Sequence, residues 1–373
     1  MKKTTFFILC LEGAILSFNV AACAALIPSI STEFRTPQFI TGKIIWLYML
    51  PYGIAALFYG PLVRIIDAKK IELVCFFLFS LANLLAAFSR NITSLFVARF
   101  FMGVFGASVI PLVLILIANS TEGQSHGRLV GIFFSATFIA SLIGVFLSGI
   151  IPWRLIFLIP AITGFILWIH IYMYLPSFKA EEAKIKINYM TSFKNKAIIS
   201  IFTYIFFISL FYHGIQQWLS VYFSNKFNFN QFLISMLITL TSLSGIFGEM
   251  IGGCFSDVIG RIKTINLGII LMIISVFLLI FKMPIAILAV LMIIWGLGWT
   301  FNHAGLSTML TDLPKEFLNE AASLNSSVRF LSGGLGAALG GCLMHKSFNL
   351  GFLVFGLSLI LLMIFSKNLL FAK

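Results

Sequence analysis

Charged residues are scarce in this 373-residue chain, where Asp, Glu, Lys and Arg together make up 10%. Proteins that fold in water carry about 25% charged residues, whereas 60% of the residues here are apolar. The mean hydropathy is +1.06, and apolar runs long enough to cross a bilayer recur throughout the sequence. This composition excludes a soluble enzyme, a disordered chain and a disulfide-stabilised secreted domain.

Several chemical motifs are missing as well. The five cysteines lie in or beside apolar runs without metal-ligand spacing, so we expect small buried hydrophobic side chains. The sequence has no glycine-rich phosphate-binding loop followed by Lys and Ser or Thr, which argues against direct use of nucleotide energy. No nucleophile or metal partner is spaced to act with a histidine. We therefore expect neither an enzyme nor a resident cofactor or metal ion.

The net charge of +13 would suit a nucleic-acid partner, but the basic residues lie in short gaps between apolar runs. That placement is typical of membrane topology signals, so we expect a lipid bilayer and no nucleic acid as partner. Twelve segments reach the ~20 residues that a spanning helix needs. They are residues 5–28, 41–63, 73–89, 94–119, 129–151, 155–175, 198–223, 231–253, 264–282, 285–306, 321–343 and 350–367.

The first span could be confused with a secretory signal, because Lys2 and Lys3 precede an apolar run that ends in a lipoprotein-like box at Cys23. Glu12 interrupts that run and many further spans follow, so we expect an uncleaved helix. The polar stretch 176–197 divides the chain into two six-span bundles, residues 1–175 and 198–373. The predicted fold is an all-α membrane protein with two pseudo-symmetric bundles, and we expect a monomer.

Lys and Arg set the orientation. With a cytoplasmic N-terminus, sixteen of the 25 basic residues fall on the inside and seven on the outside, and two lie within spans. The excess predicts that both termini and the central linker are cytoplasmic. We expect an integral protein of a bacterial inner membrane.

A short hairpin repeats in the two halves. Residues 60–70 (GPLVRIIDAKK) follow span 2, and residues 253–263 (GCFSDVIGRIK) follow span 8, 193 positions later. Its glycines permit close helix packing, its acid favours a helix N-terminus, and its cations hold the loop inside. Two six-span halves with matching hairpins indicate a transporter built by duplication.

At these positions the chain resembles the major facilitator superfamily. The second hairpin is similar to the family signature G-x-x-x-D-x-x-G-R-x-[KR] at Gly253, Asp257, Gly260, Arg261 and Lys263. The first hairpin departs from it, because Arg64 stands where the family has Asp and Asp67 where it has Gly, although Gly60 matches. Span 4, ARFFMGVFGAS, is similar to the family's R-x-x-x-G-x-x-[GA] pattern, and Trp153-Arg154-x-x-Phe157 resembles a common family turn. The resemblance implies conformational roles for Gly60, Asp67, Gly253, Asp257, Gly260 and Arg261.

Ionisable residues inside spans are functional candidates, because an unpaired charge in lipid is costly. Glu12 in span 1 shares a helical face with Asn19, and we expect it to carry a proton when dry and to ionise when water or a cation arrives. Arg99 in span 4 stands where the resemblance implies a cation that tunes the proton site. The alternatives are structural: Glu12 paired with a neighbouring helix, and Arg99 in an interhelical ion pair, with Glu12 as one candidate partner.

Polar and aromatic side chains in the second half form the predicted substrate-binding surface. They share helical faces in spans 7, 10 and 11, and planar or cationic ligands suit such surfaces. The set is His213, Gln216, Gln217, Trp295, Trp299, Asn302 and Arg329, with Asn19 from the first half. Interface anchoring of the tryptophans, helix contacts of Asn302 and His303, and structural pairing of Arg329 remain alternatives. We expect Glu249 to pair with the hairpin cations.

These features predict a secondary transporter that moves a small molecule by alternating access, with a central cavity between the halves. Proton-coupled efflux of drug-like or metabolic compounds, siderophores included, is the leading hypothesis. Span 5 lacks the Gly-Pro pair that the family's proton-driven exporters usually carry, which leaves proton-coupled uptake as the runner-up. A non-transporting membrane sensor on the same scaffold is the third alternative.

Overall fold

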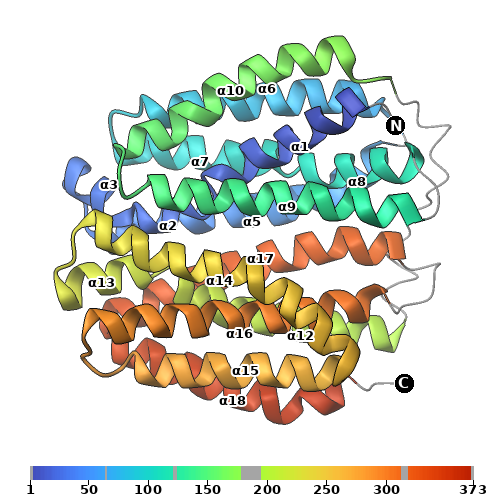
Figure 1. Cartoon of the computed structure of the whole chain (residues 1–373). Helices are drawn as coiled ribbons and strands as arrows, with labels where there is room; N and C mark the ends of the chain where they lie inside the picture. The colour runs from blue at the N-terminus through green and yellow to red at the C-terminus, as the bar shows by residue number, and fades with distance from the viewer. Residues whose placement is uncertain (1–2, 64, 121–123, 178–194, 312–317, 371–373) are drawn as a thin grey trace. The chain divides into compact units, whose positions relative to one another are not determined.

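The computed structural model describes residues 3–63, 65–120, 124–177, 195–311 and 318–370, and every regular element in these ranges is a helix (Figure 1). The chain divides into two compact units, residues 1–187 and 188–373. The predicted linker, 176–197, lies outside the described residues except at its two ends.

The N-terminal unit contains ten of the described helices. They are α1 (Lys3–Phe18), α2 (Ala22–Ala25), α3 (Ile27–Phe34), α4 (Gln38–Thr41), α5 (Lys43–Leu62), α6 (Ala68–Ala87), α7 (Ile92–Gly106), α8 (Val109–Ser120), α9 (Gln124–Leu147) and α10 (Trp153–Tyr174). The described helices of the C-terminal unit are α12 (Lys196–Gln216), α13 (Leu219–Phe227), α14 (Gln231–Val258), α15 (Arg261–Leu278), α16 (Ile285–Thr311), α17 (Leu318–Lys346) and α18 (Phe348–Leu370).

Within the described ranges, twelve helical segments are long and apolar enough to cross a membrane, which confirms the predicted all-α fold with twelve spans. They run from 18 to 32 residues with mean hydropathy between 1.2 and 2.6. The first covers Lys3–Ala25, so it begins and ends slightly earlier than predicted. Many large apolar side chains remain exposed on the helices, among them Phe58, Ile166 and Ile364, as expected where lipid replaces water. Cys254 and Cys342 are also exposed, contrary to the expectation that all five cysteines are buried.

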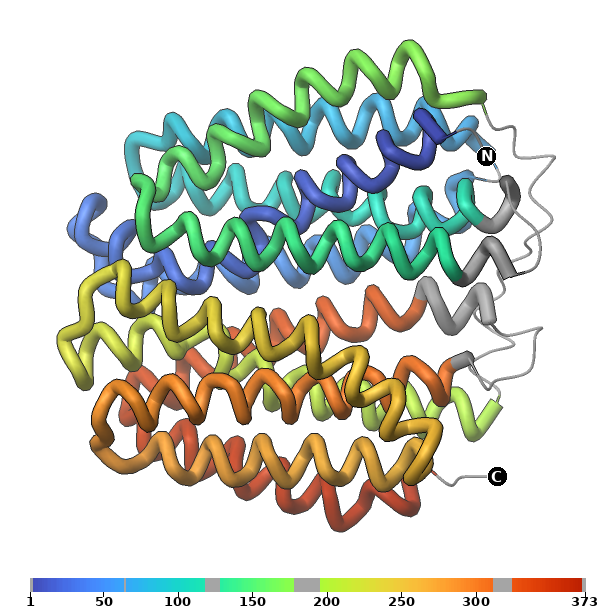
Figure 2. Tube along the Cα trace, in the orientation of Figure 1, coloured from blue at the N-terminus to red at the C-terminus, as the bar shows by residue number. Residues whose placement is uncertain are grey.

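The two units repeat one pattern of helix pairing. In the first unit α1 packs on α9, α5 on α7, and α6 on α10 (Figure 1). In the second unit the corresponding spans pack in the same way, α12 on α17, α14 on α16, and α15 on α18. Figure 2 shows α15 and α16 running side by side from the turn that joins them. The shared pairing agrees with the duplication that the hairpins indicate.

Among the described residues, four spans are each divided between two helices. Span 1 is interrupted between Phe18 and Ala22, span 2 near its start between Thr41 and Lys43, span 4 between Gly106 and Val109, and span 7 between Gln216 and Leu219. Spans 1 and 7 are the first spans of the two halves, so the break is part of the repeated pattern. Breaks in membrane helices free backbone groups and redirect side chains, which is how transporters commonly build polar sites.

Two glycines at equivalent positions let helices touch backbone to backbone. A Cβ at Gly144 of α9 would overlap the carbonyl oxygen of Phe18 on α1, and a Cβ at Gly336 of α17 would overlap that of Leu210 on α12. Backbone atoms cannot move aside as a flexible side chain can. Small residues at such contacts are what allow membrane helices to pack closely.

Valine at either glycine is therefore expected to separate the two helices and to destabilise the fold. We expect a cost of about 1–3 kcal/mol, the range for overpacking a tight contact, seen as a lower melting temperature of the detergent-solubilised protein. Gly131→Ala on α9 is the matched control, since nothing lies within 4 Å of a Cβ there. If Gly144→Val and Gly336→Val melt like Gly131→Ala, the backbone contacts do not hold these helices.

Candidate functional site

The second hairpin is held by an ion pair and a glycine turn. Arg261 Nη1 lies 2.8 Å from Asp257 Oδ1 and also donates to the Ser256 carbonyl at 3.0 Å. Gly260 has a φ of 93°, a conformation that favours glycine because it lacks a Cβ. Gly253 has nothing within 4 Å of a Cβ, so the close approach expected of this glycine is not seen.

The first hairpin is arranged differently. Asp67 accepts a hydrogen bond of 2.8 Å from the Lys69 amide and so caps the N-terminus of α6. Gly60 lies within α5, where it is buried. Arg64 lies outside the described residues. The hairpins therefore share their place in the repeat, while their acids make different contacts, a helix cap in the first and an ion pair in the second.

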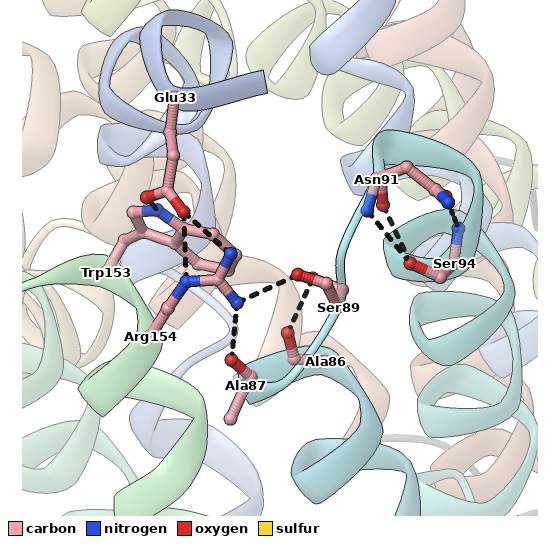
Figure 3. Close-up of polar contacts among 8 residues, drawn as sticks. All are labelled: Glu33, Ala86, Ala87, Ser89, Asn91, Ser94, Trp153 and Arg154. Atoms are coloured by element: carbon pink, nitrogen blue, oxygen red, sulfur yellow. Dashed lines mark hydrogen bonds and ion pairs between the residues drawn. The ribbon is translucent and has the colours of Figure 1, made fainter.

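The family-like turn at Trp153 and Arg154 ties the ends of three spans together (Figure 3). Arg154 donates from both Nε and Nη2 to Glu33 Oε1, at 3.0 and 2.6 Å, and from Nη1 to the carbonyls of Ala87 and Ser89. The Trp153 indole donates to the same Glu33 carboxylate at 2.5 Å. This cluster is partly exposed, and we interpret it as structural because its groups satisfy one another.

Arg99 lies on α7 and is 1% exposed. Its Nε donates to the Ile44 carbonyl at 3.0 Å, and its guanidinium lies 4.2 Å from the ring centre of Tyr48. Nη1 is buried without a hydrogen-bond partner, and no acidic residue of the described ranges lies within 4 Å. The proposed alternative of an Arg99–Glu12 ion pair is therefore wrong in this structure.

A buried guanidinium that lacks a carboxylate partner costs folding free energy. Arg99→Met removes that charge at similar length, so we expect it to raise the melting temperature, by about 1–2 °C for each kcal/mol gained in a chain of this size. Tyr48→Phe serves as control, because it keeps the ring under the guanidinium. A melting temperature lowered by Arg99→Met would show that the bond to Ile44 and the Tyr48 contact outweigh desolvation.

Glu12 is fully buried on α1 and faces a second buried acid, Glu72 on α6. The two carboxyl groups lie within hydrogen-bonding range of each other. None of their four oxygens has another hydrogen-bond partner. Glu12 is thus paired with a neighbouring helix, as the structural alternative had it, but its partner is an acid.

Asn19 lies at the break after α1, also fully buried. Its amide nitrogen donates to Asn83 Oδ1 on α6 at 2.5 Å, while Asn83 donates to the Phe79 carbonyl at 2.9 Å. The α1 segment and α6 therefore meet through two polar pairs, the two acids and the two amides. The predicted role of Asn19 in substrate binding stays a prediction.

In the C-terminal unit an aromatic stack joins α12 to α16. Tyr212 lies between two tryptophans, its ring centre 5.1 Å from Trp295 and 3.9 Å from Trp299, with interplanar angles of 17° and 12°. Trp295 is fully buried and donates to Gln216 Oε1 at 2.7 Å, whereas Trp299 is half-buried. The outer face of the stack is therefore that of Trp299.

Polar groups converge beside Trp299. Arg329 on α17 lies 5.7 Å from its ring centre, held by a bond of 2.8 Å from Nε to Asn325 Oδ1. Its Nη1 and Nη2 are buried and have no hydrogen-bond partner among the described residues. His213 is in edge contact with Trp299, and its Nδ1 lies 3.0 Å from the amide nitrogen of Gln217. An aromatic face beside unpaired guanidinium donors can bind a planar ligand that carries acceptor atoms.

Glu249 on α14 contacts His303 on α16, with Glu249 Oε1 2.6 Å from His303 Nδ1. The expected pairing of Glu249 with the hairpin cations is wrong, because the helix rotates the carboxylate toward α16. Asn302 is fully buried and donates to the Tyr204 hydroxyl at 3.0 Å and to the Ile265 carbonyl at 3.4 Å. That arrangement agrees with the helix-contact alternative for Asn302.

The structure therefore brings His213, Gln217, Trp299 and Arg329 together on one surface of the C-terminal unit, and places Trp295 and Gln216 behind Tyr212.

Two residues of these clusters, Glu72 and Tyr212, were not predicted from the sequence. Glu72 lies at a span boundary next to lysines, and a tyrosine inside an apolar helix gives no periodic signal. Among the described residues, no three His, Cys, Asp or Glu side chains come together as metal ligands.

The sequence is similar to those of known transport proteins. The chain is 24% identical over 344 residues to the purine ribonucleoside efflux pump NepI of Salmonella enteritidis PT4, covering 87% of this chain and 85% of the relative. NepI of Salmonella typhi is 23% identical over the same coverage.

Solved structures agree on the architecture. The nucleoside transporter NupG superposes with a TM-score of 0.77 at 15% identity, covering 100% of both chains. A bacterial homologue of the human lysosomal transporter Spinster superposes with a TM-score of 0.78 at 11% identity, covering 100% of this chain and 97% of the other. The family model of the Major Facilitator Superfamily matches residues 9–337 and 201–372. The chain is therefore an integral membrane protein and a transporter of small molecules rather than an enzyme, and it belongs to the major facilitator superfamily.

Proposed function

We propose that this protein exports a purine nucleoside or a close heteroaromatic relative from the cytoplasm in exchange for protons. One observation carries the proposal: Arg329 has two buried, unpaired guanidinium nitrogens beside the half-buried face of Trp299. A purine base would stack on that face and offer its ring nitrogen or exocyclic oxygen to the guanidinium, the bidentate geometry by which arginine reads guanine. The names of the NepI and NupG relatives support this substrate class.

The polar neighbours suit the rest of such a ligand. His213 lies next to Tyr212 on α12, Gln217 caps the C-terminus of that helix, and both provide donors and acceptors for ribose hydroxyls. Arg329 also lies in electrostatic range of His213 and Glu249. Specificity for a hydroxylated sugar follows, because buried polar groups left unpaired by a deoxy analogue would weaken binding.

Proton coupling is assigned to Glu12 in the N-terminal unit. Glu12 is the acid buried in the first span, and no cation of the described residues lies within 4 Å of its carboxyl group. Its charge therefore depends on whether it carries a proton. Arg99 supplies a buried positive charge in the same unit, in contact with Tyr48, and is assigned a longer-range influence on that charge. The hairpins and the helix breaks of spans 1 and 7 would serve alternating access. We place the protein in a bacterial inner membrane with both termini cytoplasmic.

Uptake by proton symport is the second candidate function. It is favoured by α9, which runs unbroken over Gln124–Leu147 without a proline, whereas proton-driven exporters of the family usually carry a Gly-Pro pair in this span. The two functions differ in the direction of the proton relative to the nucleoside. Both use the same binding surface and the same acid.

The test is accumulation of radiolabelled inosine or adenosine by everted vesicles from cells that produce the protein. Respiration acidifies the lumen of such vesicles, so an exchanger accumulates nucleoside in the lumen, and nigericin abolishes the accumulation by collapsing the pH gradient. Vesicles from cells without the protein are the control. Equal accumulation in both preparations would contradict the proposed export.

A further inference from the structure

The buried pair Glu12–Glu72 is the least expected polar feature of the N-terminal unit. Both side chains have 0% exposure. They come from helices far apart in sequence, α1 and α6, and their carboxyl groups lie within hydrogen-bonding range of each other. No donor of the described residues reaches any of their four oxygens.

The surroundings hold no compensating charge. The titratable groups that face Glu72 are the Tyr59 hydroxyl on α5 and the Cys75 thiol on α6, both neutral groups. These two satisfy each other, since the thiol donates to the Tyr59 oxygen at 3.4 Å and the Tyr59 hydroxyl donates to the Val104 carbonyl at 2.9 Å. Glu72 is the one charged group that faces Glu12 in the described structure. Arg99, in the same unit, is engaged by Ile44 and Tyr48 instead.

Two ionised carboxylates in this position would repel each other in a medium of low dielectric, with no donor to stabilise either. A carboxyl group that carries a proton becomes a donor, and the facing carboxylate is the acceptor within reach. A single proton between the two therefore satisfies the contact that the protein itself leaves open. The ligand that this site lacks is a proton.

We infer that Glu12 and Glu72 together form one shared-proton site, in which Glu72 is a coupling residue equal in importance to Glu12. The inference rests on the proposed proton coupling, and it replaces a single proton-binding acid, Glu12, by a pair of acids. The pair holds one proton at net charge −1 and takes a second from water to become neutral; on release, that second proton returns to water and the charge of −1 is restored. Since both side chains are sealed in this conformation, exchange with water occurs in another one.

The pair differs from a lone acid in a measurable way. Loss of either carboxyl leaves the other facing a neutral glutamine side chain, still fully buried and without a cation beside it among the described residues, so the remaining acid stays protonated. Each single substitution therefore replaces the shared proton by one that belongs to a single acid and is not released. The double substitution removes no further releasable proton, because groups that act as one unit are non-additive.

The experiment uses the full-length protein reconstituted in liposomes, as wild type, Glu12→Gln, Glu72→Gln and the double variant. Infrared spectroscopy in H₂O and D₂O detects the carbonyl stretch of a protonated carboxyl group without any transport substrate. The expected result is a band at neutral pH in wild type that shifts in frequency in each single variant, where the proton no longer bridges to a carboxylate, and that is lost in the double variant. A band at the same frequency in wild type and in Glu72→Gln would overturn the inference.

Transport provides the second readout. We expect proton-driven inosine flux to fall roughly tenfold or more in each single variant, with the double variant no lower than the weaker single one. Ser80→Ala is the matched control on α6, because the buried Ser80 hydroxyl donates to the Phe76 carbonyl of its own helix, and the flux and band of this variant should equal those of wild type. Monodisperse elution and a cooperative melting transition establish that each variant is folded.

The two proposals fail separately. Flux that is proton-driven in wild type and lost in Glu12→Gln but kept in Glu72→Gln overturns the shared site and leaves the proposed function standing. A shared band in wild type without any proton-driven flux overturns the proposed function, while the proton site itself is supported.

Discussion

Replacing Arg329 with glutamine is expected to weaken purine nucleoside binding by about ten- to a hundredfold, since hydrogen bonds to a charged group contribute ~1.5–3 kcal/mol. The reason is that Nη1 and Nη2 are buried, unpaired and next to the Trp299 face. A bound base would supply hydrogen-bond acceptors for these two nitrogens, which have none among the described residues. Isothermal titration of inosine into the detergent-solubilised protein measures the change in Kd directly.

Two further variants separate recognition from structure. Arg329→Lys keeps the charge but not the planar fork, so it should recover only part of the affinity. Asn325→Ala removes the bond that holds Nε while leaving both terminal nitrogens in place, and we expect a smaller loss than for Arg329→Gln. Equal affinity in wild type and Arg329→Gln would exclude this guanidinium from the binding surface.

The second large effect is expected from Trp299→Ala. Stacking of a base on an aromatic side chain contributes ~1–3 kcal/mol, so Kd should rise by about five- to a hundredfold. Trp299 is also packed at 3.9 Å against Tyr212, so its loss will expose a second ring. Trp299→Phe should restore much of the affinity, because phenylalanine keeps a face for stacking.

A tryptophan of the N-terminal unit provides the comparison. Trp168 on α10 donates to the Leu73 carbonyl at 2.9 Å and packs on Phe77, so Trp168→Ala perturbs packing without touching the proposed surface. Its Kd should match that of wild type even if its melting temperature falls. Parallel losses of affinity in Trp168→Ala and Trp299→Ala would mean that the Trp299 effect reports general destabilisation.

The spans could be predicted because a bilayer imposes length and apolarity on every crossing helix. The breaks within spans 1, 4 and 7 could not. No proline stands at 19–21, 107–108 or 217–218, while Pro51, Pro61 and Pro160 lie inside helices that continue past them. The close contacts at Gly144 and Gly336 could not be predicted either. A glycine in a sequence indicates that another helix can pack closely there, but it does not indicate which helix does so.

The residues of the candidate sites could likewise be predicted only in part. Glu12 stood out because an acid interrupts an apolar run, whereas Glu72 follows the hairpin lysines and reads as part of a polar boundary. The partner of Glu249 depends on the rotation of α14 against α16, and a difference of one residue would turn the carboxylate away from His303. His213, Trp299 and Arg329 could be named from helical spacing, but Tyr212, which stacks against Trp299, could not.

The most direct measurement follows lumen pH in proteoliposomes that contain the protein and trapped pyranine. Inosine added outside should enter in exchange for protons, so the lumen becomes more alkaline, and valinomycin with K⁺ on both sides prevents a charge gradient from limiting the flux. Liposomes that contain Glu12→Gln should show no change. A lumen that stays at constant pH in wild type, or one that acidifies as a symporter would make it, would contradict proton-driven export.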